Sequence, residues 1–163
     1  MKAHGIDPSQ KDWRKYLELL PEDQRRDFRR FSRQLENELD AGHGKCVLRQ
    51  ANIAAIVSDT LTYFDGQRYA LGDCVIMPNH VHLVAGGLAR QAMLTQVESW
   101  KKWSAIKINE ALRRKGRFWQ DESFDHLIRG EESFQKLRRY IAENPGRARL
   151  REGEYVWWQG GPA

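Results

Sequence analysis

Apolar residues recur at helical spacing along most of the chain. Between residues 68 and 86 they are instead nearly consecutive. The helical period predicts five helices, over residues 9–20, 21–41, 50–64, 91–115 and 131–143. The last is expected to stop before Pro145, because proline lacks the N–H that a helix interior uses. Runs rich in apolar and β-branched residues predict two strands, 68–77 and 80–86, joined at the turn-forming pair Pro78-Asn79.

The order of these elements predicts an α+β domain, in which helices surround a few antiparallel strands. Short segments at 118–120 and 126–129 are two further candidates for extended structure. No internal repeat interrupts this pattern, so the helices and strands are expected to share one compact fold.

Two histidines, His80 and His82, lie one residue apart at the start of the second predicted strand. Because side chains alternate along a strand, both imidazoles are expected on one face of the sheet. Two converging neutral imidazoles suit a divalent metal ion, but a closed site needs three or four protein ligands. The alternative interpretation is that one histidine packs or hydrogen-bonds while the other faces water.

The last predicted helix supplies a candidate nucleophile and a candidate third ligand. Tyr140 and Asn144 are four residues apart and therefore share a helix face, with Lys136 one turn earlier. Asn144 is expected at or past the helix end, where its carboxamide is free to turn toward a partner. A divalent cation can polarise a phosphodiester while a tyrosine hydroxyl attacks it. Taken singly, Tyr140 fits an ordinary core-edge position better than a catalytic one, and Asn144 fits a C-terminal cap as well as a ligand position.

The net charge of +5 is concentrated in one part of the chain. Residues 101–151 hold 14 Lys/Arg and 7 Asp/Glu, whereas the remainder holds 13 and 15. A localised basic surface predicts a polyanionic partner, most often nucleic acid, although the run at 113–117 could also complement a helix dipole. The candidate DNA contacts are Arg113, Arg114, Lys115, Arg117, Arg129, Lys136, Arg138 and Arg139.

Composition argues against a membrane protein. No apolar run approaches the roughly 20 residues that span a bilayer, and the first residues carry no signal-peptide pattern. The two cysteines, Cys46 and Cys74, form no CxxC pair. We therefore expect a cytoplasmic protein with reduced thiols.

Two sets of residues resemble a known family. Met77-Pro78-Asn79-His80-Val81-His82-Leu83 resembles the His-hydrophobic-His motif of single-tyrosine transposases. The later segments resemble their REP-associated branch, which acts on repetitive extragenic palindromes: Phe118-Trp119-Gln120, Phe124-Asp125-His126, Ile128-Arg129, Tyr140-Ile141 and Asn144-Pro145. On this basis we divide the chain into a helical extension at 1–44, a transposase IS200-like catalytic domain at 45–152, and a tail at 153–163.

The resemblance implies a ferredoxin-like antiparallel sheet and an enzyme that cuts and rejoins single-stranded DNA beside a hairpin. It implies that Tyr140 forms a 5′-phosphotyrosine intermediate, and that His80, His82 and Asn144 hold Mg²⁺ or Mn²⁺. The implied partner is hairpin-forming single-stranded DNA. A monomer and a homodimer both remain open.

One feature departs from the family pattern. Relatives commonly begin with a strand that enters the sheet beside the histidine strand, and no such strand is evident before residue 45. A DNA-binding protein that has lost catalysis is therefore the alternative hypothesis. A hydrolase that activates water at the histidine pair is a third, but the sequence offers it no evident carboxylate base.

Overall fold

The computed structural model describes residues 45–121, 123, 128 and 130–160 of the 163-residue chain. All of these residues belong to one compact unit, Gly42–Ala163. The expected N-terminal helices at 9–20 and 21–41, the helical extension as a whole, and Arg129 lie outside the described residues.

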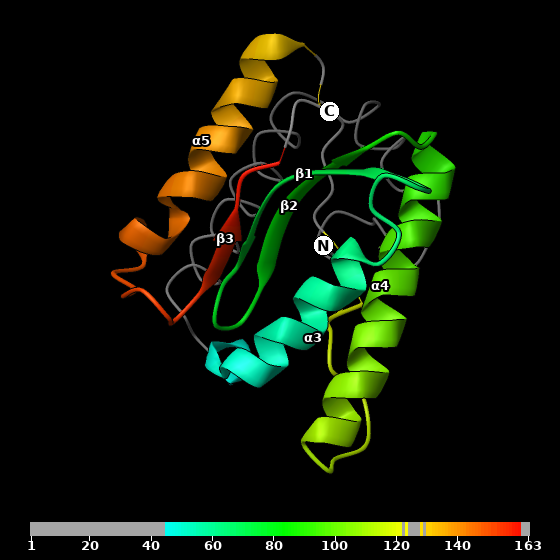
Figure 1. The fold of residues 1–163 in the computed structure, drawn as a ribbon, viewed down its shortest axis with the longest axis vertical. Helices are drawn as coiled ribbons and strands as arrows, with labels where there is room; N and C mark the ends of the chain where they lie inside the picture. Colours follow the sequence, from blue (N-terminus) through cyan, green and yellow to red (C-terminus); the bar gives the residue numbers. More distant parts are fainter. Residues whose placement is uncertain (1–44, 122, 124–127, 129, 161–163) are drawn as a thin grey trace, which may run out of the picture. The chain divides into compact units, whose positions relative to one another are not determined.

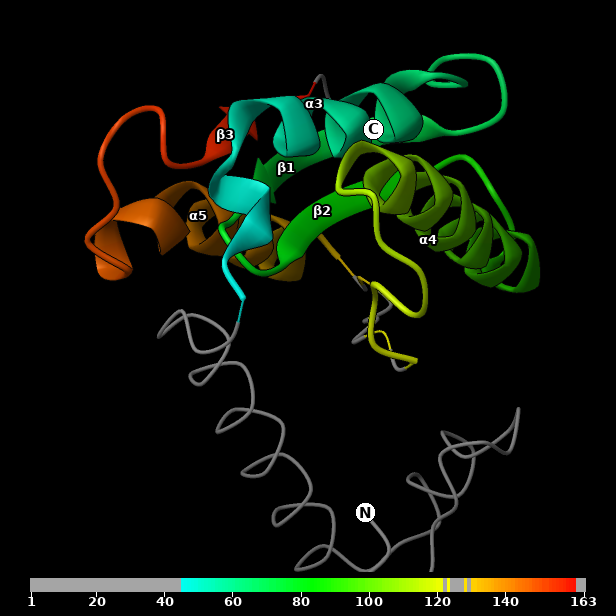
Figure 2. The ribbon, with the colours of Figure 1, turned by 90° about the horizontal axis from the view of Figure 1, so that it is seen from below.

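The described residues form a three-stranded antiparallel sheet that carries helices on both faces (Figures 1 and 2). Strand β1 (Ala70–Ile76) lies between β2 (Val81–Gly86) and β3 (Val156–Trp158). The helices are α3 (Ala51–Thr62), α4 (Arg90–Ala111), α5 (Glu131–Arg147) and the short 3-10 helix η2 (Val47–Arg49). The predicted α+β class with an antiparallel sheet is confirmed.

The sheet separates two apolar cores because β1 is buried on both faces. Cys74 and Ile76 point into the core that α3 and α4 close, together with buried residues such as Trp100. Val75 and Met77 point to the other face, where Ile141 of α5 meets them. Successive residues of a strand face opposite sides, so one apolar strand serves both layers.

Two helix ends differ from the expected ones. Helix α4 ends at Ala111, before the predicted 115, and Arg113 follows in a left-handed conformation with φ of 50°. Helix α5 continues through Pro145 to Arg147, so the expected stop before proline is wrong. Proline removes only its own N–H from the ladder, and beyond it the N–H of Ala148 still donates to Asn144 O at 3.0 Å. Burial of Pro145 against the fold favours the continued helix.

The segment 118–120 is not a strand. Phe118 and Trp119 instead pack against the core of α3 and α4, and the indole Nε1–H of Trp119 donates to Ser104 Oγ at 2.8 Å. A strand does form in the stretch assigned to the tail, where Val156, Trp157 and Trp158 pair with Ile76, Val75 and Cys74 of β1. Three residues are too few for their periodicity to reveal a strand.

The histidine strand β2 has one strand neighbour within the described residues. Val75 pairs with His82, and the N–H of Met77 donates to His80 O at 2.8 Å. Hydrogen-bonded and non-bonded pairs alternate in an antiparallel ladder, so Val81 and Leu83 turn their backbone groups toward the other edge. The described sheet therefore has β2 at its margin.

None of the helices in the described ranges is long and apolar enough to cross a bilayer.

Candidate functional site

The two histidines meet where the β1–β2 turn enters β2. Their Nε2 atoms are 3.0 Å apart, and the ring planes are inclined at 80° with centroids 4.6 Å apart. Two nitrogens at about 2.1 Å from one octahedral cation would be separated by about 3.0 Å. The separation therefore fits adjacent ligands of a single ion as well as a hydrogen bond between the rings.

Asn79 orients the first of these rings. Its side-chain Oδ1 lies 2.7 Å from His80 Nδ1. An amide oxygen only accepts, so Nδ1 carries the proton and donates, which in a neutral ring leaves the lone pair on Nε2. Such a contact fixes the tautomer and orientation of a metal-binding histidine. In the sequence Asn79 indicates only a turn, and its position next to a candidate ligand is the signal for this second role.

Tyr140 reaches the histidine pair from α5. Ile141, which is fully buried, fixes this part of the helix against Val75, Met77 and Val84. The Tyr140 ring centroid lies 5.1 Å from that of His82, with the planes at 76°. Two residues some sixty positions apart in sequence are thus neighbours in space.

Asn144 lies inside α5 and is completely buried, so the expectation of a residue at or past the helix end is wrong. It shares the helix face of Tyr140, one turn further on. Within the described residues, neither Oδ1 nor Nδ2 of its amide has a hydrogen-bond partner. A buried polar group without a partner costs about 1–3 kcal/mol, so its retention calls for a role.

These donors fit a divalent cation. No three His, Cys, Asp or Glu side chains within the described ranges are arranged to hold a metal. The candidate donors are the two imidazoles, which converge to 3.0 Å, and the buried amide oxygen of Asn144, which has no hydrogen-bond partner among the described residues. Mg²⁺ and Mn²⁺ accept oxygen ligands such as this amide while keeping several waters.

The candidate DNA contacts fall into two groups. Arg113, Arg114, Lys115 and Arg117 follow the C-terminal end of α4, on the other side of the sheet from the histidines. Lys136, Arg138 and Arg139 lie on α5, in the two turns before Asn144. Lys136 pairs with Glu132 at 2.7 Å, whereas Arg139 is exposed.

Arg138 turns inward to β1. Its Nε donates to Asp73 Oδ2 at 2.8 Å and its Nη2 to Oδ1 at 3.3 Å, and these hydrogen bonds raise the pKa of the guanidinium. The backbone N–H of Gly160 also donates to Asp73, at 3.0 Å. A Cβ at Gly160 would fall on the backbone of Gly72, so this close approach requires glycine. Asp73 thus joins α5, β1 and the segment after β3; an acidic residue within an apolar strand is the sequence signal for it.

Comparison with known families finds a match for the central part of the chain. The family model described as transposase IS200 like matches residues 51–144, which is more than half of the chain. No curated protein and no solved structure matches it. The matched stretch begins with α3, contains the histidine pair and Tyr140, and ends at Asn144. The chain therefore belongs to the transposase IS200-like family.

Proposed function

We propose that this transposase cleaves and rejoins single-stranded DNA through a covalent link to Tyr140, with a divalent cation at His80, His82 and Asn144. The observation that carries the proposal is the packing of the Tyr140 ring against His82, 5.1 Å between centroids. The ring of the proposed nucleophile thus contacts His82, whose Nε2 lies 3.0 Å from that of His80.

The chemistry requires Tyr140 Oη to attack a phosphorus atom of the DNA backbone. The new bond joins Oη to phosphorus, the phenol loses its proton, and the bond from phosphorus to the 3′-oxygen breaks. The 3′-oxygen takes up a proton and leaves as a hydroxyl, while the 5′-phosphate stays on Tyr140. Attack of a 3′-hydroxyl on this link reverses the reaction and rejoins the ends.

A cation bound here would neutralise charge that develops on the non-bridging phosphate oxygens. The residues of the chain prepare that environment. His80, held by Asn79, presents Nε2 toward His82. Ile141 and the sheet exclude water from one side of α5. Arg147 places its guanidinium 5.6 Å from the Tyr140 ring centroid, where a cation is attracted to the aromatic face.

The REP-associated branch is the subtype that we propose, with a hairpin of repetitive extragenic palindromes as the DNA target. Its support is the run of motifs around Phe118-Trp119-Gln120, Tyr140 and Asn144-Pro145. In the fold, Phe118 and Trp119 are half-buried and pack against the core that α3 and α4 close, which accounts for their apolar character.

The test is formation of a protein–DNA adduct that survives denaturing electrophoresis, using a labelled hairpin oligonucleotide with single-stranded flanks and Mn²⁺. Tyr140→Phe should give no adduct. Tyr63→Phe is the matched control, because Tyr63 is 73% exposed and lies away from the histidines on the end of α3; it should react as the parent does. An adduct with Tyr140→Phe would refute the assignment.

A second function, DNA binding without cleavage, is motivated by the marginal position of β2 in the described sheet. It predicts hairpin binding that EDTA leaves unchanged and no adduct with any divalent cation. Metal-dependent adducts of the parent protein would exclude it.

A further inference from the structure

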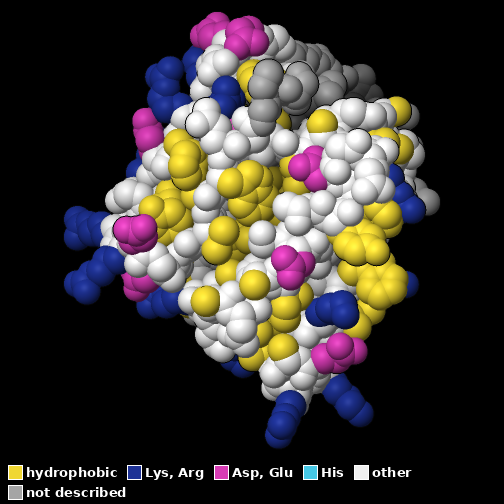
Figure 3. Space-filling model, viewed as in Figure 1, with side chains coloured by type: hydrophobic (Ala, Val, Ile, Leu, Met, Phe, Trp, Pro, Cys, Tyr) yellow, Lys and Arg dark blue, Asp and Glu magenta, His cyan; other side chains and the backbone are white. Residues whose placement is uncertain are grey.

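The outward side of α4 exposes large apolar side chains that a folded domain usually buries. Trp103 is 57% exposed and Ile106 is 40% exposed, and they lie three residues apart on one helix face. The opposite side of the same helix carries Trp100, Ser104 and Ile108, all buried. In Figure 3, hydrophobic side chains are visible over α4, along the right side of the view.

The C-terminal half of α4 and the turn after it are strongly basic. Residues 101–117 hold seven Lys/Arg and one acidic residue, Glu110. Three of these cations have intramolecular partners: Lys101 with Glu98, Arg114 with Arg117 O, and Arg117 with Asp121. Across the part of the chain that the structure describes, the side chains of Lys102, Lys107, Arg113 and Lys115 have no hydrogen-bond or ion-pair partner.

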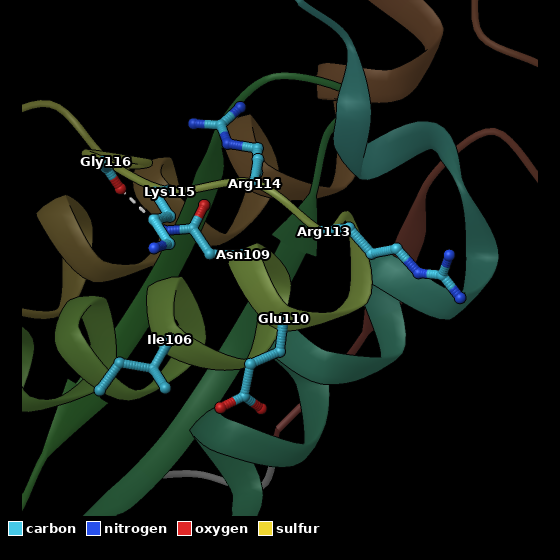
Figure 4. Close-up of a pocket in the computed structure, with 7 residues that line it drawn as sticks. All are labelled: Ile106, Asn109, Glu110, Arg113, Arg114, Lys115 and Gly116. Carbon is cyan, nitrogen blue, oxygen red and sulfur yellow. Dashed lines mark hydrogen bonds between the residues drawn. The ribbon is translucent and has the colours of Figure 1, made fainter.

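An open hollow of about 570 Å³ lies at the C-terminal end of this surface. Arg113 and Arg114 project from the turn beside it in different directions (Figure 4). It extends from Ile106 past Glu110 to the turn at 113–116. The Nδ2–H of Asn109 donates to Gly116 O at 2.7 Å and holds the turn against the helix. Arg113 adopts its φ of 50° here, a conformation that costs a residue with a side chain roughly 1 kcal/mol. The turn therefore contains a destabilising backbone conformation at Arg113, whose side chain is exposed.

We infer that this surface, the α4 outer strip (Lys102, Trp103, Ile106, Lys107, Arg113 and Lys115), binds single-stranded DNA, with Trp103 stacking on a base. A polyanion complements four cations that have no partner among the described residues, whereas a second copy of a chain with net charge +5 would oppose them. Unpaired bases also offer the planar faces that an exposed indole accepts, which a duplex conceals.

The strip is separate from the candidate active site, since α4 and α5 pack on opposite faces of the sheet (Figure 2). DNA on the strip is therefore a flanking segment and not the scissile phosphate. The inference rests on the proposed function only in taking DNA as the ligand.

The experiment measures binding of the full chain to fluorescein-labelled oligothymidine of about 20 nucleotides, in EDTA so that no cleavage intervenes. Trp103→Ala should weaken binding about tenfold, and Trp103→Phe should recover most of the loss because a phenyl ring still stacks. Tyr63→Ala, the matched exposed aromatic, should bind as the parent does.

The double variant Lys102→Gln/Lys107→Gln should lower the slope of log affinity against log salt by about 1.4, from two lost phosphate contacts. The paired control Lys45→Gln/Arg90→Gln removes two exposed cations outside the strip and should leave the slope nearly unchanged. Binding by Trp103→Ala within about twofold of the parent, or an equal loss in Tyr63→Ala, would overturn the inference.

Loss of self-association in Trp103→Ala, measured by sedimentation, with DNA binding intact would assign the strip to a second copy and also overturn it. The proposed function fails on a different result, an adduct formed by Tyr140→Phe. The two failures are therefore distinguishable.

Discussion

Helices α4 and α5 pack on opposite faces of one sheet, and each carries four Lys or Arg residues, yet they use these charges differently. Three of the four on α5 have carboxylate partners: Lys136 with Glu132, Arg138 with Asp73, and Arg147 with Glu143. On α4, within the described residues, only Lys101 has one, Glu98. Two of the α5 pairs lie within the helix, and Arg138–Asp73 joins α5 to the sheet. The unpaired cations of α4 would be available to a polyanion.

The two helices also differ in how far their large side chains are buried. The inner face of α5 is buried around Ile141 and Asn144, and its Tyr140 contacts His82. The outer face of α4 leaves Trp103 exposed. Two helices with the same number of basic residues are thus proposed for different roles, chemistry for α5 and DNA binding for α4, and four sets of substitutions test that division.

The largest effect is expected from His82→Ala, which removes one of the two converging imidazoles. The rate of adduct formation with Mn²⁺ should fall at least about 100-fold, because the cation loses a direct ligand. Binding of oligothymidine in EDTA, measured by anisotropy, should stay within about twofold of the parent. A large loss of oligothymidine binding in His82→Ala would show that the histidine face of the sheet also binds this DNA, so that cleavage and DNA binding are not assigned to separate faces.

Arg138→Gln should lower the melting temperature by several degrees, because it leaves the buried carboxylate of Asp73 without its cation. Arg139→Gln removes an exposed neighbour and should melt with the parent. The double variant Asp73→Asn/Arg138→Gln should regain part of the loss, since no buried charge then remains. Equal melting temperatures for Arg138→Gln and the parent would mean that this pair does not anchor α5.

Asn144→Leu should stabilise the metal-free protein by about 1–2 kcal/mol in urea unfolding, because it replaces a buried amide that has no partner with an apolar side chain of similar size. Mn²⁺ should raise the melting temperature of the parent but not of this variant. Asn52→Leu, at an exposed position of α3, should change stability by less than about 0.5 kcal/mol. Destabilisation of the metal-free protein by Asn144→Leu would contradict the proposal that the Asn144 amide is a metal ligand with no structural role of its own.

The smallest effect separates single lysines. Lys102→Gln should lower the salt slope for oligothymidine binding by about 0.7, the value for one phosphate contact on a single strand. Lys136→Gln should change it less, because Lys136 is already neutralised by Glu132. Equal salt slopes for Lys102→Gln and Lys136→Gln would show that the lysines of α4 and α5 contribute equally to DNA binding, which would contradict the difference proposed between the helices.

Much of the fold could be predicted from the sequence, for definable reasons. The strands at 68–77 and 80–86 and the helix at 50–64 follow from local periodicity and turn residues, and they agree with β1, β2 and α3 to within a few residues. Strand alternation alone placed His80 and His82 on one face, where their Nε2 atoms are 3.0 Å apart. These features depend on near neighbours, so the sequence carries them directly.

Other features depend on contacts between distant segments, and only the tertiary structure decided them. Packing on the sheet carries α5 through Pro145 and buries Asn144 inside the helix. Strand β3 exists because β1 offers it an edge, and Asp73 meets Arg138 65 residues away. Local sequence propensity does not indicate such partners, because the free energy of these contacts is gained only when distant segments meet in the folded chain. The sequence alone thus determined the histidine pair and the candidate nucleophile, while tertiary packing determined which charges are committed to the fold and which remain available to DNA.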